Sequence, residues 1–407
     1  FPYTTLFRSR SRKQLFILVL FLLPIMASAK EVRIDGLYYK LDTKNKVADM
    51  AWSTTKYSGS VVIPEKVEYD GIWYTVTSLD GAFSVCTKLT SVTIPNSVTN
   101  IGSYTFSDCT SLNTITIPNS VTSMGDNAFE DCTGLNSITM GNSVTSIGIA
   151  AFRGCVSLTS ITIPSSVTSI DGYAFDECTS LTSVHISNLK SWCNIAFYNL
   201  ESNPLRYAHH LFLNGVEIND LVIPNSITSI KWGAFSNCFG LTSVTIPNSV
   251  ESIGDLAFAG CTGLTSVTLP NSLTSIKYRT FYYCTNLQDV YCYARNAPEL
   301  EDDAFKDASI KNATLHVPTA SVSEYNAAPD WKTFKKIEAL WDEAVIAKYD
   351  LCIDGVIDAL DLKVLVNYIK KIDNAVVPQF DINNDNKVNV ADVVLMIDFI
   401  QKTEGPQ

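Results

Sequence analysis

Charge is scarce in this 407-residue chain, because only 17% of its residues are Asp, Glu, Lys or Arg, against roughly 25% in an average soluble domain. The formal net charge of −11 argues against a nucleic-acid binder that relies on a basic face. Long apolar runs are also missing. The one run apolar enough to insert into a membrane, residues 15–25, is too short to span a bilayer comfortably. With 46% hydrophobic residues, the chain is nevertheless too apolar to be disordered.

The motifs of common enzymes are missing as well. The sequence has only four histidines and contains no nucleophile elbow, phosphate-binding loop, H-E-x-x-H zinc motif or C-x-x-C pair. Its acidic residues occupy no recurrent position that would place two carboxylates in one pocket, as glycoside hydrolysis requires. We therefore expect a protein without enzymatic activity. The adjacent His209 and His210 are better interpreted as folded residues than as a metal pair.

The first residues are expected not to belong to the mature protein. Residues 1–9 resemble a translated sequencing adapter, and we interpret them as an artefact. Residues 10–29 resemble a secretory signal peptide, with a basic start, the apolar run 15–25 and an A-x-A cleavage site that ends at Ala29. A short membrane anchor is the alternative. We therefore predict that the mature chain is exported.

A 23-residue repeat dominates the rest of the sequence. A typical unit reads L-T-S-V-T-I-P-N-S-V-x-S-I-G-x-x-A-F-x-x-C-T-x. The cysteines of successive units lie 23 residues apart, and a phenylalanine precedes each by three positions. Two groups of units share this spacing and are marked by Cys86, Cys109, Cys132, Cys155, Cys178 and by Cys238, Cys261, Cys284. Such a period indicates a repeat architecture.

The spacing within one unit predicts its local structure. Leu89, Val92 and Ile94 can point inward from a short strand, and the following Pro95 ends the strand because proline has no donor for the ladder. Gly102 is expected to supply a permissive backbone at a bend. The return path is expected to be lined by Val98, Ile101, Phe106 and Cys109. One coil cannot bury these residues alone, so we predict a solenoid of short parallel strands stacked coil on coil.

Over residues 58–340 the chain resembles the BspA-type leucine-rich repeats of bacterial surface and secreted proteins. The resemblance implies a curved right-handed solenoid that serves adhesion and protein recognition without catalysis. Residues 30–57 are expected to form an N-terminal cap, because terminal coils are atypical. A C-terminal cap is expected from Tyr325, Trp331, Phe334 and Ile337.

The cysteines of the repeat allow two interpretations. In a secreted protein they suggest disulfides, and neighbouring coils would bring them close enough. Each of them nevertheless occupies an apolar column, and cysteine behaves as a small buried hydrophobe. We favour buried free thiols, with disulfides along the column as the alternative. Eleven cysteines in total leave at least one thiol unpaired in the absence of intermolecular bonds.

One coil is lengthened. The step from Leu181 to the next unit start, Ile218, is 37 residues, and the segment 188–217 is rich in aromatic residues. Aromatic side chains dominate binding hot spots, so we predict that partner specificity resides here. The predicted partner-binding residues are Trp192, Tyr198, Tyr207, His209, His210 and Phe212. The alternative is that these residues only fill the enlarged coil.

Two acidic loops follow the repeats, 31 residues apart, and match the spacing of an EF-hand-like calcium loop. The first offers side-chain oxygens from Asp350, Asp354, Asp358 and Asp361 and the backbone carbonyl of Val356. The second offers side-chain oxygens from Asp381, Asn383, Asp385, Asn389 and Asp392 and the carbonyl of Lys387. An amphipathic helix is predicted after each loop, with apolar residues Leu362, Leu365, Val366 and Ile369 in the first and Val393, Val394, Ile397 and Ile400 in the second.

Residues 347–402, with two such loops and a helix after each, resemble a type I dockerin. The resemblance implies a small all-α domain that folds around two Ca²⁺ ions and docks to a cohesin domain on another protein. One departure is Cys352 at loop position 3, where the family usually has Asn or Asp. The first site is therefore expected to be the weaker one.

Together these features predict a bacterial protein that is secreted or displayed on the cell surface and is not an enzyme. Its solenoid is expected to bind a protein partner, and its C-terminal module to dock to a cohesin-like domain. The alternative is an accessory subunit of a dockerin-assembled polysaccharide-degrading complex, in which the solenoid targets a glycan or a partner enzyme. No nucleic-acid partner and no transmembrane span in the mature chain are expected.

Overall fold

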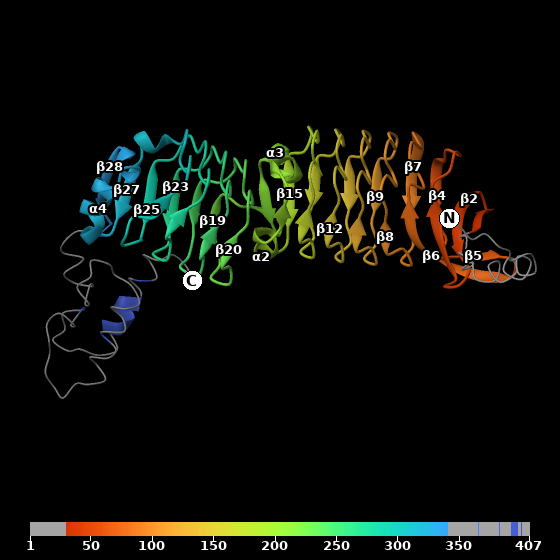
Figure 1. Ribbon diagram of the computed structural model, residues 1–407, viewed down its shortest axis with the longest axis horizontal. Coiled ribbons are helices and arrows are strands. Elements are labelled where there is room, and N and C mark those ends of the chain that lie inside the picture. The colour runs from red at the N-terminus through yellow and green to blue at the C-terminus, as the bar shows by residue number, and fades with distance from the viewer. Residues whose placement is uncertain (1–29, 341–364, 366–381, 383–391, 398–399, 401–407) are drawn as a thin grey trace, which may run out of the picture.

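The computed structural model describes residues 30–340, 365, 382, 392–397 and 400. Residues 30–340 form an elongated solenoid whose coils stack along its long axis (Figure 1). The predicted solenoid of short parallel strands is confirmed, because strands of neighbouring coils pair in parallel and in register. The predicted adapter-like segment and signal peptide lie outside the described residues, and no described helix is long and apolar enough to cross a membrane.

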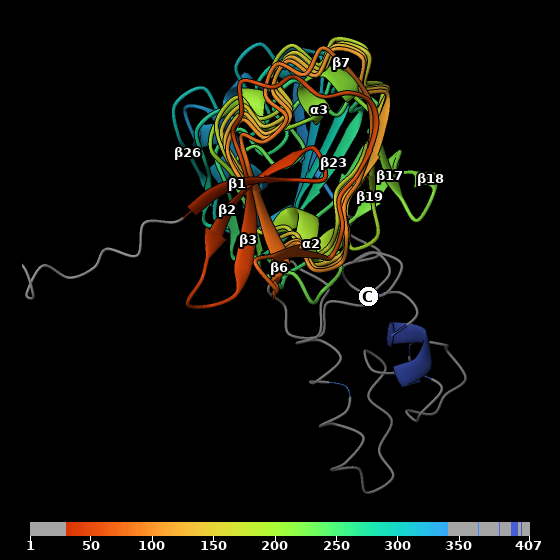
Figure 2. The ribbon, with the colours of Figure 1, turned by 90° about the vertical axis from the view of Figure 1, so that its right-hand side faces the viewer.

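Each regular coil contributes two strands rather than the single strand expected. In one coil β9 (Thr114–Thr116) precedes Pro118, and β10 (Ser123–Met124) follows it on another side of the coil. Figure 2, which looks along the solenoid, shows the coils superposed with these strands on different sides. We call the first series the Thr face, after Thr93 and Thr116, and the second series the Ser face, after Ser123.

The ladders of the Thr face are interrupted between β7 and β9, between β11 and β13 and between β17 and β19. Its strands are β4 (Ser58–Val62), β7 (Lys88–Thr93), β9, β11 (Ser137–Thr139), β13 (Ser160–Thr162), β15 (Ser183–Ile186), β17 (Leu211–Leu213), β19 (Asp220–Val222), β21 (Ser243–Thr245), β23 (Ser266–Leu269), β25 (Asp289–Cys292), β27 (Thr314–Val317) and β28 (Lys336–Ala339).

The ladders of the Ser face are interrupted in the same region, between β16 and β20, and again between β22 and β24. Its strands are β6 (Ile72–Asp80), β8 (Asn100–Ile101), β10, β12 (Ser146–Ile147), β14 (Ser169–Ile170), β16 (Ala196–Phe197), β20 (Ser229–Ile230), β22 (Ser252–Ile253), β24 (Ser275–Ile276) and β26 (Glu299–Leu300). Neither set of ladders runs without a break from one end of the solenoid to the other.

Stacked phenylalanines form the centre of the core. From Phe83 to Phe175 the ring centroids of neighbouring coils are 5.1–5.3 Å apart, and the rings are nearly parallel. The column resumes at Phe235 and continues to Phe305. The predicted inward residues of the strands are buried, whereas Thr93 is exposed. The assignment of inward and outward columns is therefore confirmed.

The glycine that recurs in the repeat, Gly102 in the first of these coils, is required for a different reason from the one expected. Gly102 does not have a positive φ, so no special backbone conformation requires it. A Cβ atom there would instead lie 2.6 Å from Asp80 Oδ1 and 2.9 Å from the Leu79 carbonyl oxygen of the preceding coil. The residues that do have a positive φ are not glycines in most coils, as Tyr104 (55°) and Tyr173 (61°) show.

All ten described cysteines are free and buried. In the regular coils the thiol lies against the preceding coil, where Cys109 Sγ donates to the Phe83 carbonyl oxygen (3.1 Å) and Cys155 Sγ to that of Phe129 (3.2 Å). Burial raises the pKa of Cys132 to about 12. The thiols are therefore neutral, apolar-packed donors in the core, in agreement with the favoured interpretation.

The two ends of the solenoid are closed by different structures. At the N-terminus β1 (Lys30–Ile34), β2 (Leu37–Asp42) and β3 (Val47–Ala51) form an antiparallel meander, and β3 pairs in parallel with β6, which also pairs with β5 (Lys66–Tyr69). At the C-terminus Tyr325 and Trp331 are buried, and their polar atoms donate to the carbonyl oxygens of Ala294 and Pro298 (2.8 Å each). The helical elements there are η2 (Ser309–Lys311), η3 (Thr319–Ser321), α4 (Val322–Ala327) and η4 (Trp331–Thr333).

The lengthened coil lies where both faces are interrupted. Besides β16 and β17, it contains α2 (Leu189–Cys193), η1 (Leu200–Ser202), α3 (Leu205–Ala208) and β18 (Val216–Glu217). In a regular coil, the Phe106 N–H donates to the Ala128 carbonyl oxygen of the next coil (2.8 Å). At the break, the corresponding carbonyl oxygen of Ala234 accepts from Trp192 Nε1 instead (3.0 Å). A side chain thus replaces a backbone donor.

Candidate functional site

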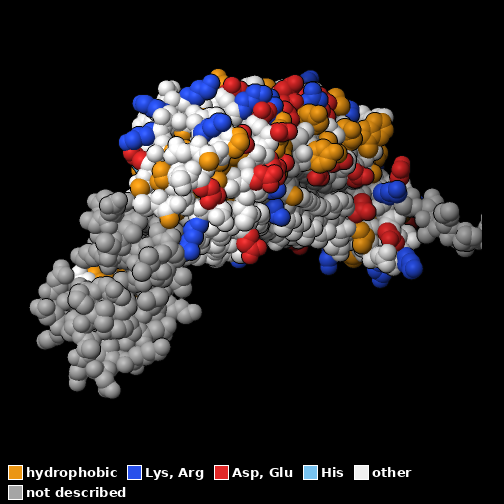
Figure 3. Space-filling view, turned by 60° about the vertical axis from the view of Figure 1, so that its left-hand side comes forward, with side chains coloured by type: hydrophobic (Ala, Val, Ile, Leu, Met, Phe, Trp, Pro, Cys, Tyr) orange, Lys and Arg blue, Asp and Glu red, His pale blue; other side chains and the backbone are white. Residues whose placement is uncertain are grey.

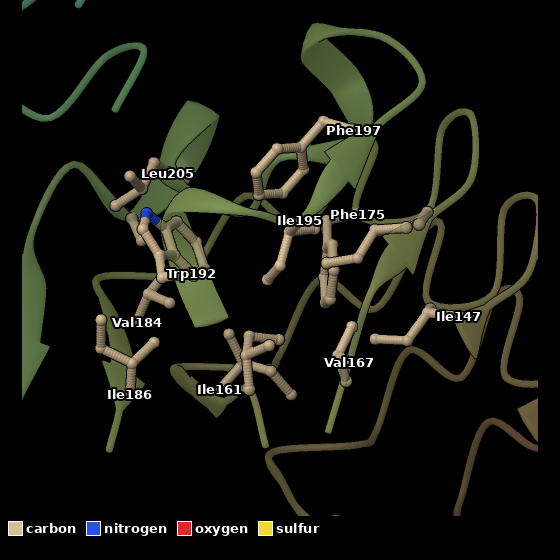
Figure 4. Packing of buried hydrophobic residues seen from close by; sticks show 14 of the residues in the cluster. Ile147, Ile161, Val167, Phe175, Val184, Ile186, Trp192, Ile195, Phe197 and Leu205 are labelled. Atoms are coloured by element: carbon tan, nitrogen blue, oxygen red, sulfur yellow. The ribbon is translucent and has the colours of Figure 1, made fainter. Parts of the chain in front are cut away.

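The structure places Trp192 inside the solenoid. Its exposed fraction is 1%, and its indole lies beside Leu205 and edge-on to Phe197 (Figure 4), with ring centroids 5.5 Å apart and an interplanar angle of 64°. The prediction that Trp192 offers surface to a partner is therefore not supported by its position. For this residue the alternative holds, because the indole fills the lengthened coil and satisfies a buried carbonyl oxygen.

Tyr198 is the most exposed of the predicted aromatic residues. It follows β16 on the Ser face, the residue is 78% exposed, and its ring lies over the backbone of Gly172. A Cβ atom on Gly172 would lie 3.1 Å from Tyr198 Cδ1. The side chain is therefore held at its base by the neighbouring coil and presents its ring to solvent.

Tyr207 and His209 are half-buried and already have partners within the chain. The Tyr207 hydroxyl donates to Asp176 Oδ1 (3.0 Å) and accepts from the Glu177 backbone N–H (3.0 Å). His209 ends α3 in a left-handed conformation (φ 60°), and its ring stacks on Phe239 with centroids 3.8 Å apart. Burial lowers the pKa of His209 below its ordinary value of 6.5, so the ring is neutral at pH 7.

His210 and Phe212 lie at the base of a hairpin that projects from the Thr face. Strands β17 and β18 pair antiparallel and protrude beyond the stacked coils (Figure 2). His210 Nδ1 lies 2.5 Å from Glu217 Oε1, and the Phe212 ring stacks on His185 with centroids 4.9 Å apart. His209 and His210 thus contact different partners, and no group of three metal-binding side chains occurs among the described residues.

The six predicted residues do not form one cluster. One is in the core, one is on the Ser face, and four follow the chain from α3 to the Thr face. The structure adds His185 and Phe239, which were not among the predicted residues. Both were detectable, since His185 replaces the column threonine of its strand (Thr162↔His185) and Phe239 replaces the threonine that follows the column cysteine.

The regular coils present a contrasting surface of small polar side chains. Threonine hydroxyl groups donate to carbonyl oxygens of the preceding coil. Thr145 Oγ1 donates to the Thr122 carbonyl oxygen (3.0 Å), and Thr168 Oγ1 donates to that of Thr145 (3.2 Å). Figure 3 shows part of this surface as a regular ribbed area with few charged side chains. Because these hydroxyls bond to neighbouring coils, the repeated surface has little to distinguish one coil from the next.

Only a few residues of the predicted calcium loops are described. Asp392, loop position 12 of the second loop, is fully buried, and its Oδ1 accepts from the Ile382 backbone N–H at position 2 (2.8 Å). This contact joins loop positions 2 and 12, and a carboxylate oxygen is a ligand type that Ca²⁺ prefers. The other predicted ligands lie outside the described residues: Asp350, Asp354, Val356, Asp358, Asp361, Asp381, Asn383, Asp385, Lys387 and Asn389.

Residues 392–397 are helical, as predicted after the second loop. Ile400 is buried as expected, but the buried face also includes Met396, which was not predicted, and Val394 is 57% exposed. The buried residues lie four positions apart, on one side of the helix. Val394 is therefore on the outer side of this helix, and its assignment to the apolar face was wrong.

Comparison with known proteins defines the class. Residues 79–203 and 208–326, more than half of the chain, match the BspA type leucine-rich repeat region in six copies. The chain therefore belongs to the BspA-type leucine-rich repeat family. The two matched stretches are separated within the lengthened coil. Residues 348–401 match the type I dockerin domain, so the predicted resemblance is confirmed for both parts.

Solved structures similar to this chain include a leucine-rich cell surface protein from Faecalibacterium prausnitzii (25% identity, 77% of this chain and 96% of that one, TM-score 0.39). A leucine-rich repeat protein from T. pallidum is 26% identical over 58% of this chain and 91% of its own (TM-score 0.38). One from Bacteroides ovatus is 23% identical over 77% of this chain and 100% of its own (TM-score 0.34). No curated protein matches the chain significantly.

Proposed function

We propose that this protein is an exported, non-enzymatic recognition protein whose solenoid binds a protein partner and whose C-terminal module anchors it to a cohesin-type domain. The observation that carries this proposal is the union, in one chain, of a solenoid with a family-matched dockerin. Recognition and adhesion need surface rather than a pocket, and the solenoid offers that surface over residues 30–340. We propose 30–57 as the cap, 58–340 as the solenoid and 347–402 as the dockerin-like domain.

The proposed anchor depends on Ca²⁺ in both loops. Converging carboxylates repel one another in a domain too small to compensate through its core, and bound calcium replaces that repulsion with coordination. Calorimetry of the full chain in calcium and in chelator tests this directly. We expect one transition, that of the module, to be lost in chelator and the solenoid transition to stay unchanged. Asp381→Ala is expected to weaken calcium binding more than Asp350→Ala, because Cys352 already impairs the first site.

Docking itself is tested with a purified type I cohesin. We expect a complex in calcium and none in chelator, measured by isothermal titration. A chain that takes up no calcium, or a module that keeps its transition in chelator, would overturn the anchoring role. The recognition role would survive that result, because the solenoid does not depend on the loops.

The recognition role is tested at the lengthened coil. Four of its predicted residues, Tyr207, His209, His210 and Phe212, extend from α3 to the projecting hairpin, and Tyr198 is exposed on the Ser face. Replacing 188–217 by a segment that restores the regular 23-residue spacing should abolish capture of a partner isolated with the parent chain. Unchanged capture by a folded variant would move specificity elsewhere on the solenoid.

The second candidate function is that of an accessory subunit in a dockerin-assembled polysaccharide-degrading complex. The dockerin match favours it, because such a module joins its carrier to other proteins. Cohesin-bearing proteins encoded in the same genome, together with retention of this chain by a purified polysaccharide, would favour this role over adhesion.

A further inference from the structure

A groove crosses the outer surface of the N-terminal end of the Ser face. It runs over β1, β2, β3, β6 and β8 to the residue that follows β10, and so crosses six neighbouring strands. Its lining combines one exposed tryptophan with three carboxylates and a stretch of small residues. The lining residues are Glu31, Lys40, Asp49, Met50, Ala51, Trp52, Ser78, Asp80, Asn100, Gly102, Ser103 and Gly125.

The floor of this groove is one cross-strand row of polar side chains. Successive pairs are Glu31↔Lys40, Lys40↔Asp49, Asp49↔Ser78 and Ser78↔Asn100. The row is hydrogen-bonded at its far end, where Asn100 Nδ2 donates to Ser78 Oγ (3.3 Å). Within this row the charged side chains lie on β1, β2 and β3 and the neutral ones on β6 and β8, while Asp80 lies beside the row, two residues after Ser78 on β6.

Asp49 is set into this row by a β-bulge. The register between β3 and β6 shifts after Ala48, so that Asp49 pairs with Ser78 and Thr77 is the extra residue. Bulges of this kind re-aim side chains, often beside binding sites. Thr77 Oγ1 donates to Asp49 Oδ1 (3.1 Å) and is the only hydrogen-bond partner of this carboxylate within residues 30–340. Burial raises the pKa of Asp49, which shows that its charged form lacks full solvation.

Trp52 forms one wall, and 61% of its side-chain surface is accessible. The ring packs at its base against Gly81, where a Cβ would lie 3.5 Å from Trp52 Cβ. Lys56 Nζ lies 5.8 Å from the ring centroid, at the outer limit of a cation–π contact, and donates to the Ser84 carbonyl oxygen. Lys56 is not among the residues that line the groove, whereas Trp52 is.

We infer that this groove binds an extended peptide segment of a partner protein through an arginine side chain, held by the Asp49 and Asp80 carboxylates and stacked on Trp52. Charge complementarity carries the assignment, since three carboxylates face one lysine in the lining. A guanidinium is planar, donates to carboxylates in a fork and stacks on aromatic rings, which a lysine ammonium does less well. This inference rests on the proposed recognition function and deepens it by naming the partner chemistry.

The dimensions and polarity of the groove define the peptide further. Six strands at about 4.8 Å spacing span about 24 Å, which is the length of about seven extended residues. Beyond the arginine, the peptide meets Ser78 and Asn100, which offer hydrogen bonds, and Gly102 and Gly125, which have no side chains to obstruct it. Small polar residues are therefore expected next to the arginine on one side.

The test uses the full chain in calcium buffer at low salt and fluorescein-labelled peptides of sequence Gly-Ser-Gly-X-Gly-Ser-Gly, with binding followed by fluorescence anisotropy. X is arginine, lysine, or citrulline, which keeps the shape of arginine and lacks its charge. We expect the arginine peptide to bind and the citrulline peptide to bind at least about tenfold more weakly, with lysine in between. Added salt should weaken the arginine complex.

Matched variants locate the binding. Asp49→Asn keeps an acceptor for Thr77, and Trp52→Ala removes the wall, so each should weaken the arginine peptide about tenfold. Asp80→Asn provides a second, exposed test of the charge. The controls are Trp73→Ala, since Trp73 is 58% exposed and outside the groove, and Glu68→Gln on β5. Both controls should bind like the parent chain.

Three results would overturn the inference. These are equal binding of the arginine and citrulline peptides, parental affinity in both Asp49→Asn and Trp52→Ala, and binding of neutral oligosaccharides such as cellohexaose in place of the peptide at the same residues. None of them would remove the recognition function, because that function is tested separately by replacement of the lengthened coil.

Discussion

In the regular coils a phenylalanine occupies the centre of each turn and stacks on the next at 5.1–5.6 Å, whereas in the lengthened coil Ser202 occupies the corresponding register position. There Trp192 reaches across from α2 and donates to the Ala234 carbonyl oxygen. Asn203 Nδ2 donates to the Gly233 carbonyl oxygen beside it (2.9 Å). Repetition is thus sufficient for the core of a regular coil, while an irregular coil needs side chains specific to that position.

Both regions contain buried thiols. Raising the pH tests their burial, and we expect it to change stability more than any of the substitutions below. Burial raises the pKa of Cys178 in a regular coil and of Cys193 in the lengthened coil to about 12, from an ordinary 9.0. The folded chain therefore holds these protons more tightly, so stability is intact below pH 9 and is lost as pH rises from 9 toward 12. Within that pH range, each thiol lowers the free energy of unfolding by about 1.4 kcal/mol per pH unit.

Circular dichroism against pH measures this loss, and we expect the solenoid to unfold near pH 10 because ten such thiols act together. Cys178→Ala and Cys193→Ala should each move the alkaline midpoint upward relative to their own stability at pH 7. A solenoid that stays folded at pH 12, or thiols that react rapidly with a labelling reagent at pH 8, would contradict the burial of these groups.

Substitution within the phenylalanine column of the regular coils is expected to have the next largest effect on the free energy of unfolding. Phe152 stacks between Phe129 and Phe175, so Phe152→Ala should lower the free energy of unfolding by about 3–5 kcal/mol. Thr162, on the outer side of β13, is the matched control, and Thr162→Ala should change it by less than about 0.5 kcal/mol. Denaturant unfolding measures both. Equal costs would mean that inward and outward columns are misassigned.

Trp192→Phe sharpens the comparison at the lengthened coil. The substitution keeps a ring in the core and removes the donor to the Ala234 carbonyl oxygen, which should cost about 1–3 kcal/mol. We also expect it to separate unfolding into two transitions, because it weakens the contact between the two stacks of coils. A single transition with unchanged midpoint in calorimetry would show that Trp192 does not couple them.

The smallest expected effect is that of Tyr198→Ala. With 78% of its side chain exposed, this change should alter the free energy of unfolding by less than about 0.5 kcal/mol. Tyr283→Ala, in a regular coil and 50% exposed, is the control for partner capture. If Tyr198→Ala lowers capture and Tyr283→Ala does not, the difference between the two regions is functional as well as structural.

The period of 23 residues was enough to predict the solenoid, the buried columns and the free thiols, because apolar residues that recur in phase must share one core. The second strand of each coil was missed, since two residues such as Ser123–Met124 form no pattern of their own. The left-handed position was hidden too. Its column carries tyrosine, asparagine and alanine at 104, 127 and 150 and glycine only in a few coils, as at Gly81 and Gly233, so no regular glycine marks it.

The lengthened coil was located from the sequence by its spacing and its aromatic content, but the roles of those residues could not be assigned. Whether an aromatic side chain points inward depends on α2 and α3, and these short helices have no repeating pattern to reveal their orientation. Trp192 and Tyr198 are six residues apart and have opposite environments. The groove at Trp52 was missed because its row joins residues from several separate strands.

The double interruption of the Thr and Ser faces has a mechanical consequence. If the C-terminal module is tethered and a ligand is held near the N-terminus, tension must pass through the whole solenoid. At this junction both faces lack a backbone ladder, and the load passes through individual contacts. These include the side chains of Trp192 and Asn203, the bond from the Lys231 N–H to the Cys193 carbonyl oxygen (2.9 Å) and that from the Gly240 N–H to the His209 carbonyl oxygen (3.3 Å). We expect this junction to yield first under force, so that the protein lengthens there while both stacks of coils stay folded.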